Sequence, residues 1–236
     1  MRFEFTADEM IYAFGQLGLD RWPNPLDLRP SVNWHDEWEA IERDLRLRFP
    51  VLDDPDLLPV LRIIADPETS LIMIGERKKP LRACGAITAN VGVTMVQRPD
   101  PTPETCGNVV IEVGTPDLVP KVFTAVAGNQ PPGRNPAMVE TWDRVIEPAP
   151  ITGLIHHAPT QADRMRDLLA APRTAHGHIE IRVDRRSARP HLPRYISWFD
   201  VTNDGRYTYT RRHGDLHIDP CTPDHFRTHL TRLTTP

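Results

Sequence analysis

The sequence predicts a mixed α+β fold built on antiparallel strands, with an approximate internal two-fold repeat. Segments with helical spacing of apolar residues alternate with runs of short, apolar-alternating strands. The connections between successive strands are short, and short connections favour antiparallel neighbours. Two local sequence patterns also recur in the same order at nearly the same separation. Together these observations favour one domain made of two similar halves.

The repeat rests on two pairs of matching segments. Thr115-Pro116-Asp117 opens one amphipathic run, and Thr222-Pro223-Asp224 opens another near the end of the chain. Earlier in each half, residues 64–69 and 169–174 both close a helical pattern and lead into a strand. The repeat predicts a single domain over residues 1–236. Its pseudo-repeat halves are expected at about 1–128 and 151–236, joined by a Pro/Gly-rich linker at 129–150.

The first half begins with a short strand at residues 3–5 and then turns helical. Thr6 and Glu9 have the spacing of a capping box, in which each side chain binds the other residue's backbone amide. A second amphipathic helix follows from the stripe Trp34, Trp38, Ile41 and Leu45, whose tryptophans are expected in the core. Asp54-Pro55-Asp56 begins a third helix, with proline at its first position.

Strands follow the third helix. A proline-rich segment at 98–107 is too long for a hairpin and is expected to be an exposed, semi-stiff loop. The amphipathic run that opens at Thr115 predicts the helix that ends this half. The four strands are expected at 71–75, 81–88, 91–96 and 108–113.

The second half has the clearer pattern. Residues 178–184 alternate between apolar and charged side chains, as in a strand with one solvated face. Asn203-Asp204-Gly205 predicts a hairpin turn, because these residues tolerate positive φ. Thr222 is expected to cap the last helix, a contribution of about 1 kcal/mol. The remaining elements are a helix at 163–170 and strands at 194–202, 206–212 and 216–219.

The hairpin carries bulky residues on both faces. Ile196 and Trp198 point one way, while Tyr195 and Phe199 point the other. A sheet with a single buried face carries polar residues on the opposite face. The second face is therefore expected to be covered, mainly by the chain's own helices or, alternatively, by a partner protein.

Composition is that of an ordinary soluble globular protein. The net charge of −4 argues against a general nucleic-acid binder, which concentrates basic residues on one face. The first thirty residues hold no apolar stretch of signal-peptide length, and no segment predicts a transmembrane helix. Three cysteines without close spacing suit a reducing cytosol. These features predict a cytoplasmic protein without membrane insertion.

Common catalytic motifs are absent from the sequence. It holds no phosphate-binding glycine loop, no nucleophile elbow and no His-Glu-x-x-His. One alternative is a metal-dependent enzyme using Cys221, His225 and His229, although Arg227 is an unfavourable neighbour for a cation. Another is a structural adaptor that self-associates through a sheet edge. The favoured expectation is a protein with neither catalytic residues nor cofactors.

Several motifs resemble the EspG family of actinobacterial type VII (ESX) secretion-associated proteins. Residues 3–10 followed by Leu17-Gly18-Leu19 look like the opening of that family. Trp198-Phe199-Asp200, Gly205-Arg206-Tyr207, Pro220, Pro223 and the closing helix are similar to its end. Residues 56–67 and Arg82-Ala83 with Gly85 fit it as well. The chain departs from the pattern at Val201, where a threonine is expected, and in the middle linker.

The resemblance implies a central antiparallel sheet with quasi-two-fold symmetry and helical bundles at either side. It also implies a cytosolic chaperone that binds helical secretion substrates, such as PE-PPE-like or WXG-type proteins, and delivers them to their ESX system. No nucleic acid is expected as a partner, and the free protein is expected to be a monomer or weak dimer.

Exposure and chemistry then suggest where a partner binds. The second half carries most of the aromatic residues and histidines, so the substrate is expected across the sheet toward that half. The candidate partner-binding residues lie in the proline-rich loop and in the final sheet and helix: Arg98, Asp100, Glu104, Trp198, Tyr207, Tyr209, Arg211, His225 and His229.

Overall fold

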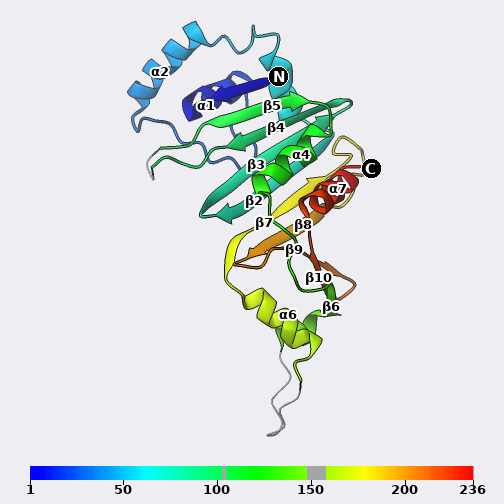
Figure 1. The fold of residues 1–236 in the computed structure, drawn as a ribbon. Coiled ribbons are helices and arrows are strands. Elements are labelled where there is room, and N and C mark those ends of the chain that lie inside the picture. The colour runs from blue at the N-terminus through cyan, green and yellow to red at the C-terminus, as the bar shows by residue number, and fades with distance from the viewer. Residues whose placement is uncertain (103–104, 148–157, 236) are drawn as a thin grey trace.

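The computed structural model describes residues 1–102, 105–147 and 158–235, and one ten-stranded antiparallel sheet runs through all of it (Figure 1). Helices cover both faces of this sheet, as the predicted α+β class requires. No helix in these ranges is long and apolar enough to cross a membrane. The strands are β1 (Arg2–Phe5), β2 (Thr69–Arg77), β3 (Lys79–Thr88), β4 (Val91–Gln97), β5 (Val109–Gly114), β6 (Met138–Thr141), β7 (Arg173–Arg182), β8 (Arg194–Val201), β9 (Arg206–Arg212) and β10 (Asp215–Pro220).

The strand order is symmetrical about the pair formed by β2 and β7. The order is β1-β5-β4-β3-β2-β7-β8-β9-β10-β6, so each half runs outward from the centre and ends on its own first strand. This order supports the internal repeat, which stays a prediction. Part of the segment expected as a linker, 129–150, forms the edge strand β6, paired with β10, and α5 (Trp142–Ile146).

Three helices cover the β3-β4-β5 end of one face. They are α1 (Ala7–Gln16), α2 (His35–Arg48) and α3 (Leu57–Ala65). The Thr6–Glu9 capping box is present, with Glu9 N donating to Thr6 Oγ1 at 3.3 Å and Thr6 N donating to Glu9 Oε2 at 2.9 Å. α3 begins later than predicted, because the Asp54 carboxylate accepts the amides of Asp56 and Leu57. The core under these helices includes Met10, Phe14, Leu61, Val93, Met95 and Ile111.

The expectation that both tryptophans of α2 lie in the core is wrong. Trp34 is 73 % exposed, Trp38 is half-buried, and Leu45 is the buried residue of the stripe. The C-terminal end of α2 is attached to α1, because Arg48 Nη1 donates to Glu9 Oε1 at 3.0 Å. Trp34 is the N-cap residue at the opposite end, so the packing against α1 does not bury it.

The other face is covered at its centre by α4 (Leu118–Ala127) and α7 (Pro223–Leu233), which lie side by side across the sheet (Figure 1). Thr222 caps α7 as predicted, accepting His225 N at 3.1 Å. The core beneath them draws on both halves and includes Leu71, Met73, Phe123, Ile179, Ile196 and Phe226. A third cluster lies under α5 and α6 (Gln161–Ala170) and includes Met138, Met165, Leu168, Phe199 and Ile218.

Two glycines meet where the halves join. β2 pairs with β7 in continuous register from Ser70–Arg182 to Glu76–His176, and Gly75 stands opposite Gly177. A Cβ atom on Gly177 would lie 2.4 Å from the Trp198 ring and 2.6 Å from the carbonyl oxygen of Ile74. The absence of side chains at these positions therefore admits the buried indole of Trp198 against the junction.

A buried ion pair fixes the hairpin of β8 and β9 to the rest of the domain. The predicted turn is present, with Asn203 at a φ of 60°. Arg206 and Asp200 are both almost fully buried, with Arg206 Nε donating to Asp200 Oδ1 at 2.8 Å. The same guanidinium donates through Nη2 to the carbonyl oxygen of Ala127, at the end of α4. Removing one partner of such a pair costs about 3–5 kcal/mol, because it leaves the other charge buried and unpaired.

We expect Gly177→Ala to destabilise the fold by about 1–3 kcal/mol, since the added methyl group overpacks the junction against Trp198 and backbone. Urea unfolding followed by circular dichroism measures the change. Gly15→Ala is the control, because its Cβ meets nothing within 4 Å and alanine is the better helix former. An unchanged midpoint for Gly177→Ala would contradict the account of the junction.

Candidate partner-binding surface

The centre of the sheet face between the two helix groups is open. The register places Ile74, His178, Ser197 and Tyr209 in one row across β2, β7, β8 and β9. Directly paired residues point to the same face, so this row forms one surface. Its neighbouring row is Ile72, Glu180 and Tyr195. We call these seven residues the central strip.

The central strip exposes apolar side chains between charged ones. Ile74 is 41 % exposed and Tyr195 is 51 % exposed. A groove of about 490 Å³ borders the strip toward α3 and is lined in part by Trp22, Ile64 and Ile72. Glu180 is ion-paired to Arg182, and this hydrogen bond raises the pKa of Arg182. An apolar centre with a charged rim is the usual composition of a protein-binding surface.

Beside the strip, β8 and β9 diverge. They pair only from Ser197–Tyr209 to Asp200–Arg206, although β8 starts at Arg194 and β9 ends at Arg212. The divergence leaves a cavity of about 530 Å³, which we call the β8–β9 cleft. Its lining includes Trp142, Tyr195, Tyr209, Arg194, Arg211, Arg212, His229 and Arg232.

Charge and burial act together on His229 in this cleft. Burial lowers the pKa of His229, and the positive charges of Arg232 and Arg212 lower it further. The negative charge of Asp219 acts in the opposite direction and is the smallest of these effects. Arg211 lies over the ring of Trp142, with its guanidinium carbon 4.8 Å from the ring centroid. The cleft is therefore electropositive and partly aromatic.

The structure brings three of the predicted partner-binding residues together. Tyr209, Arg211 and His229 all line the β8–β9 cleft. His225 is exposed on α7 but does not line this cavity.

Two predicted residues are removed from the surface by burial. Trp198 is fully buried against α7, where its ring packs edge-on against Phe226. Tyr207 is also fully buried, and its hydroxyl donates to Asp204 Oδ2 at 2.6 Å and accepts from Asn135 N at 3.0 Å. Both side chains build the core, so the expectation that they contact a partner is corrected: neither presents a surface to one.

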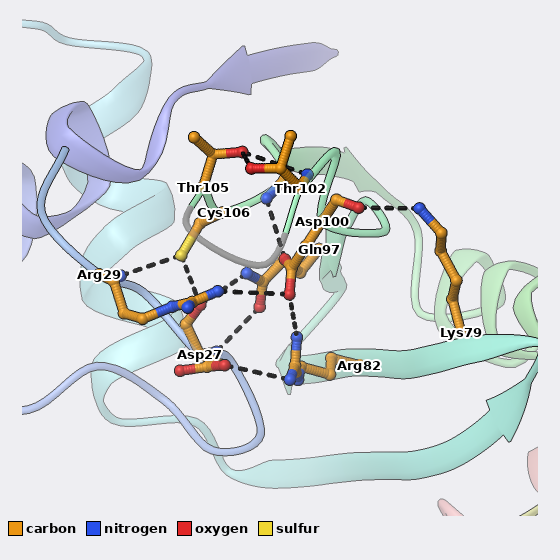
Figure 2. A network of polar contacts seen from close by, with 10 residues as sticks. Asp27, Arg29, Lys79, Arg82, Gln97, Asp100, Thr102, Thr105 and Cys106 are labelled. Carbon is orange, nitrogen blue, oxygen red and sulfur yellow. Dashed lines mark hydrogen bonds and ion pairs between the residues drawn. The ribbon is translucent and has the colours of Figure 1, made fainter.

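The proline-rich loop is tied inward and does not stand free (Figure 2). Asp100 Oδ2 lies 3.5 Å from Arg82 Nη1, and Asp100 Oδ1 accepts the amide of Gly107 at 3.1 Å. Its backbone oxygen accepts from Lys79 Nζ at 2.8 Å. Arg98 donates two 2.9 Å hydrogen bonds to the carboxylate of Glu4.

These loop contacts are internal to the first half. Arg98 and Asp100 are separated from the β8–β9 cleft by β3, β2 and β7, so the predicted residues do not form one site. Glu104 lies outside the described residues. The loop contacts stabilise the β3–β4 end of the sheet, while the cleft and strip lie toward the second half.

Other surface residues emerge only from the fold. Ile72 and Ile74 come from a strand whose neighbouring residues Leu71 and Met73 are also apolar, so its sequence does not distinguish the two faces. Trp142 lies in the segment expected as a linker. Arg212 and Arg232 lie on β9 and α7, and nothing in their local sequence links them. The sequence held one signal of this surface: Tyr195 points to the face of its strand opposite to Ile196, so a bulky side chain is expected on each face.

The alternative metal site is not assembled. Among the described residues, no group of three or more His, Cys, Asp or Glu side chains could hold a metal ion. Cys221 is buried, and burial raises the pKa of its thiol to about 11. His225 is exposed on α7, outside the pocket lined by His229.

The fold and surface define a class: a single-sheet α+β protein with helices on both faces and an open strip beside a basic cleft. Residues 6–232 match the family model described as the EspG family, and the chain belongs to that family. No curated protein sequence matches the chain significantly.

A solved structure has the same fold. It is the Mycobacterium tuberculosis type VII secretion system chaperone EspG5 in complex with the PE25-PPE41 dimer. The TM-score is 0.67 at 12% sequence identity, and the match covers 100% of this chain and 97% of that chain. At this identity the likeness shows the fold.

We expect Arg212→Gln combined with Arg232→Gln to raise the pKa of His229, because two positive charges that oppose its protonation are removed. The pKa stays below the ordinary value, since burial is the larger cause. An NMR titration of the histidine ring measures it. Arg43→Gln with Arg46→Gln on α2 is the charge-matched control and should leave His229 unchanged. A doubly substituted protein with the original pKa would contradict this arrangement of charges.

Proposed function

We propose that this protein is a cytosolic chaperone that binds helical type VII secretion substrates, keeps them soluble and targets them to the ESX secretion system. Membership of the EspG family supports the proposal, and the structural neighbour EspG5 is a chaperone in complex with a PE25-PPE41 dimer. The observation that carries it is the central strip, a sheet surface left open between two helix groups. The partner is a PE-PPE-like heterodimer or a related WXG-type protein.

The chemistry of the strip suits an exposed helical tip. Ile72, Ile74 and Tyr195 supply apolar area that a partner would remove from water, at roughly 25 cal/mol per Å² buried. Glu180 and His178 stand beside them and would disfavour partners whose polar groups do not match. Binding of this kind shields the aggregation-prone surface of the substrate. It also lets the rim select which substrate is held.

This function requires no catalytic residue and no cofactor. The protein acts by binding, and the free chain is a monomer or weak dimer in the cytosol. A self-associating adaptor is the competing function, and it predicts a stable dimer without substrate. Light scattering on the purified chain separates the two.

Co-expression with the PE-PPE-like or WXG-type proteins encoded beside it tests the proposal. We expect a soluble complex that co-purifies with the chain. Ile74→Asp should then raise the Kd by about 30-fold or more, the effect of losing a contact worth about 2 kcal/mol. Titration calorimetry on the purified complex components measures the change.

Val139→Asp is the matched control. Val139 is an apolar strand residue with 44 % exposure, close to the 41 % of Ile74, but it lies on the edge strand β6 away from the central strip. Its substitution should leave the Kd within about threefold, as for a residue outside an interface. Failure of every neighbouring protein to co-purify or gain solubility would overturn the proposed function. If Ile74→Asp and Val139→Asp change the Kd equally, the central strip is not the binding surface.

A further inference from the structure

The β8–β9 cleft concentrates positive charge on a chain that is negative overall. Four arginines line it, Arg194, Arg211, Arg212 and Arg232, and its described lining contains no aspartate or glutamate. The whole chain has a net charge of −4, so this cluster is not a consequence of a generally basic protein. These charges line a cavity, and water screens charges in a cavity less than charges on a flat surface.

Two of the four guanidinium groups are held in place by the fold. Arg194 Nη1 donates to the carbonyl oxygen of Leu233 at 3.0 Å, which fixes the end of α7 to β8. Arg211 makes a cation–π contact with the ring of Trp142. A cation–π contact of this kind does not use the N–H groups of the guanidinium, which can still donate hydrogen bonds.

Among the described residues the other two arginines, Arg212 and Arg232, form no ion pair, although Asp215 stands opposite Arg212 in the register of β9 and β10. Arg212 and Arg232 are exposed. Both line the same cavity as His229, so they converge on one space from β9 and α7, and both lower the pKa of that histidine. Like charges brought together without an ion-paired carboxylate repel one another. A bound anion would relieve that repulsion.

We propose that the β8–β9 cleft binds an acidic segment of the protein partner, with its carboxylates on Arg211, Arg212 and Arg232. The planar guanidinium group donates paired hydrogen bonds that match the geometry of a carboxylate. Tyr195 and Trp142 supply apolar contact for the aliphatic part of the segment. The divergence of β8 from β9 leaves room for an extended chain between them.

The cleft adjoins the surface proposed above. Tyr195, Ser197 and Tyr209 belong both to the central strip and to the lining of the cleft. The inference therefore deepens the proposed function and rests on it for the identity of the partner: a substrate seated on the strip places an acidic segment in the cleft. The binding of an acidic peptide itself does not depend on that identity.

The experiment uses the intact chain and a fluorescein-labelled oligo-glutamate peptide, with an oligo-glutamine peptide and a single-stranded oligonucleotide of matched charge as comparisons. Fluorescence anisotropy at low ionic strength measures the Kd of each. We expect the glutamate peptide to bind most tightly and to weaken with added salt. The double variant Arg212→Glu/Arg232→Glu should raise its Kd by about tenfold or more.

Arg43→Glu/Arg46→Glu is the control, because it changes the net charge equally on the exposed face of α2. Its effect on the peptide Kd should stay below about threefold, since it acts only through long-range charge. Equal weakening by the two double variants would overturn the inference, and so would tighter binding of the oligonucleotide. Circular dichroism shows that each variant is folded.

The same variants in the partner assay keep the two proposals separate. Suppose that a partner co-purifies with the wild-type chain and that Arg212→Glu/Arg232→Glu leaves its Kd unchanged. That result overturns the cleft inference alone. A chain that binds the glutamate peptide through the cleft but retains no PE-PPE-like or WXG-type protein supports the cleft and overturns the proposed function.

Discussion

The pairing of β2 with β7 is the interaction on which the rest of the structure depends. It joins two sets of strands, distant in sequence, into one continuous sheet. Because the pairing is antiparallel and central, α4 from the first half and α7 from the second half meet over it and share a core. Gly75 and Gly177 are needed there, since only a bare backbone admits Trp198. A slip of register would move Ile74 to the opposite face.

The same junction creates the surface proposed to bind a partner. On one face α4 and α7 seal the centre of the sheet, and on the other the helices gather at the two ends. The middle of that second face is consequently bare, although its strands carry Ile72, Ile74 and Tyr195. A chain that leaves apolar side chains exposed on a central sheet strip has a surface suited to another protein. The charged neighbours keep this surface compatible with water.

The β8–β9 hairpin shows how stability and function share one element. Its turn end is fixed by the buried Arg206–Asp200 pair and by the hydroxyl contacts of Tyr207. Its open end diverges, and Arg211 and Arg212 line the cleft there. A hairpin held firmly at one end can hold such groups in defined positions at the other. The aromatic residues that look like binding residues in the sequence belong to the fixed end, which explains why Trp198 and Tyr207 are core.

The sequence by itself determined the class of fold, most strand positions, the caps at Thr6 and Thr222 and the turn at 203–205, because these depend on local periodicity and hydrogen bonding. It also carried the family resemblance. Only the tertiary structure decided which aromatic side chains are buried, because a strand with bulky residues on both faces does not reveal which helices cover it. The meeting of Arg212 with Arg232, and the inward ties of Asp100, likewise depend on long-range packing. Local sequence patterns carry no information about such contacts.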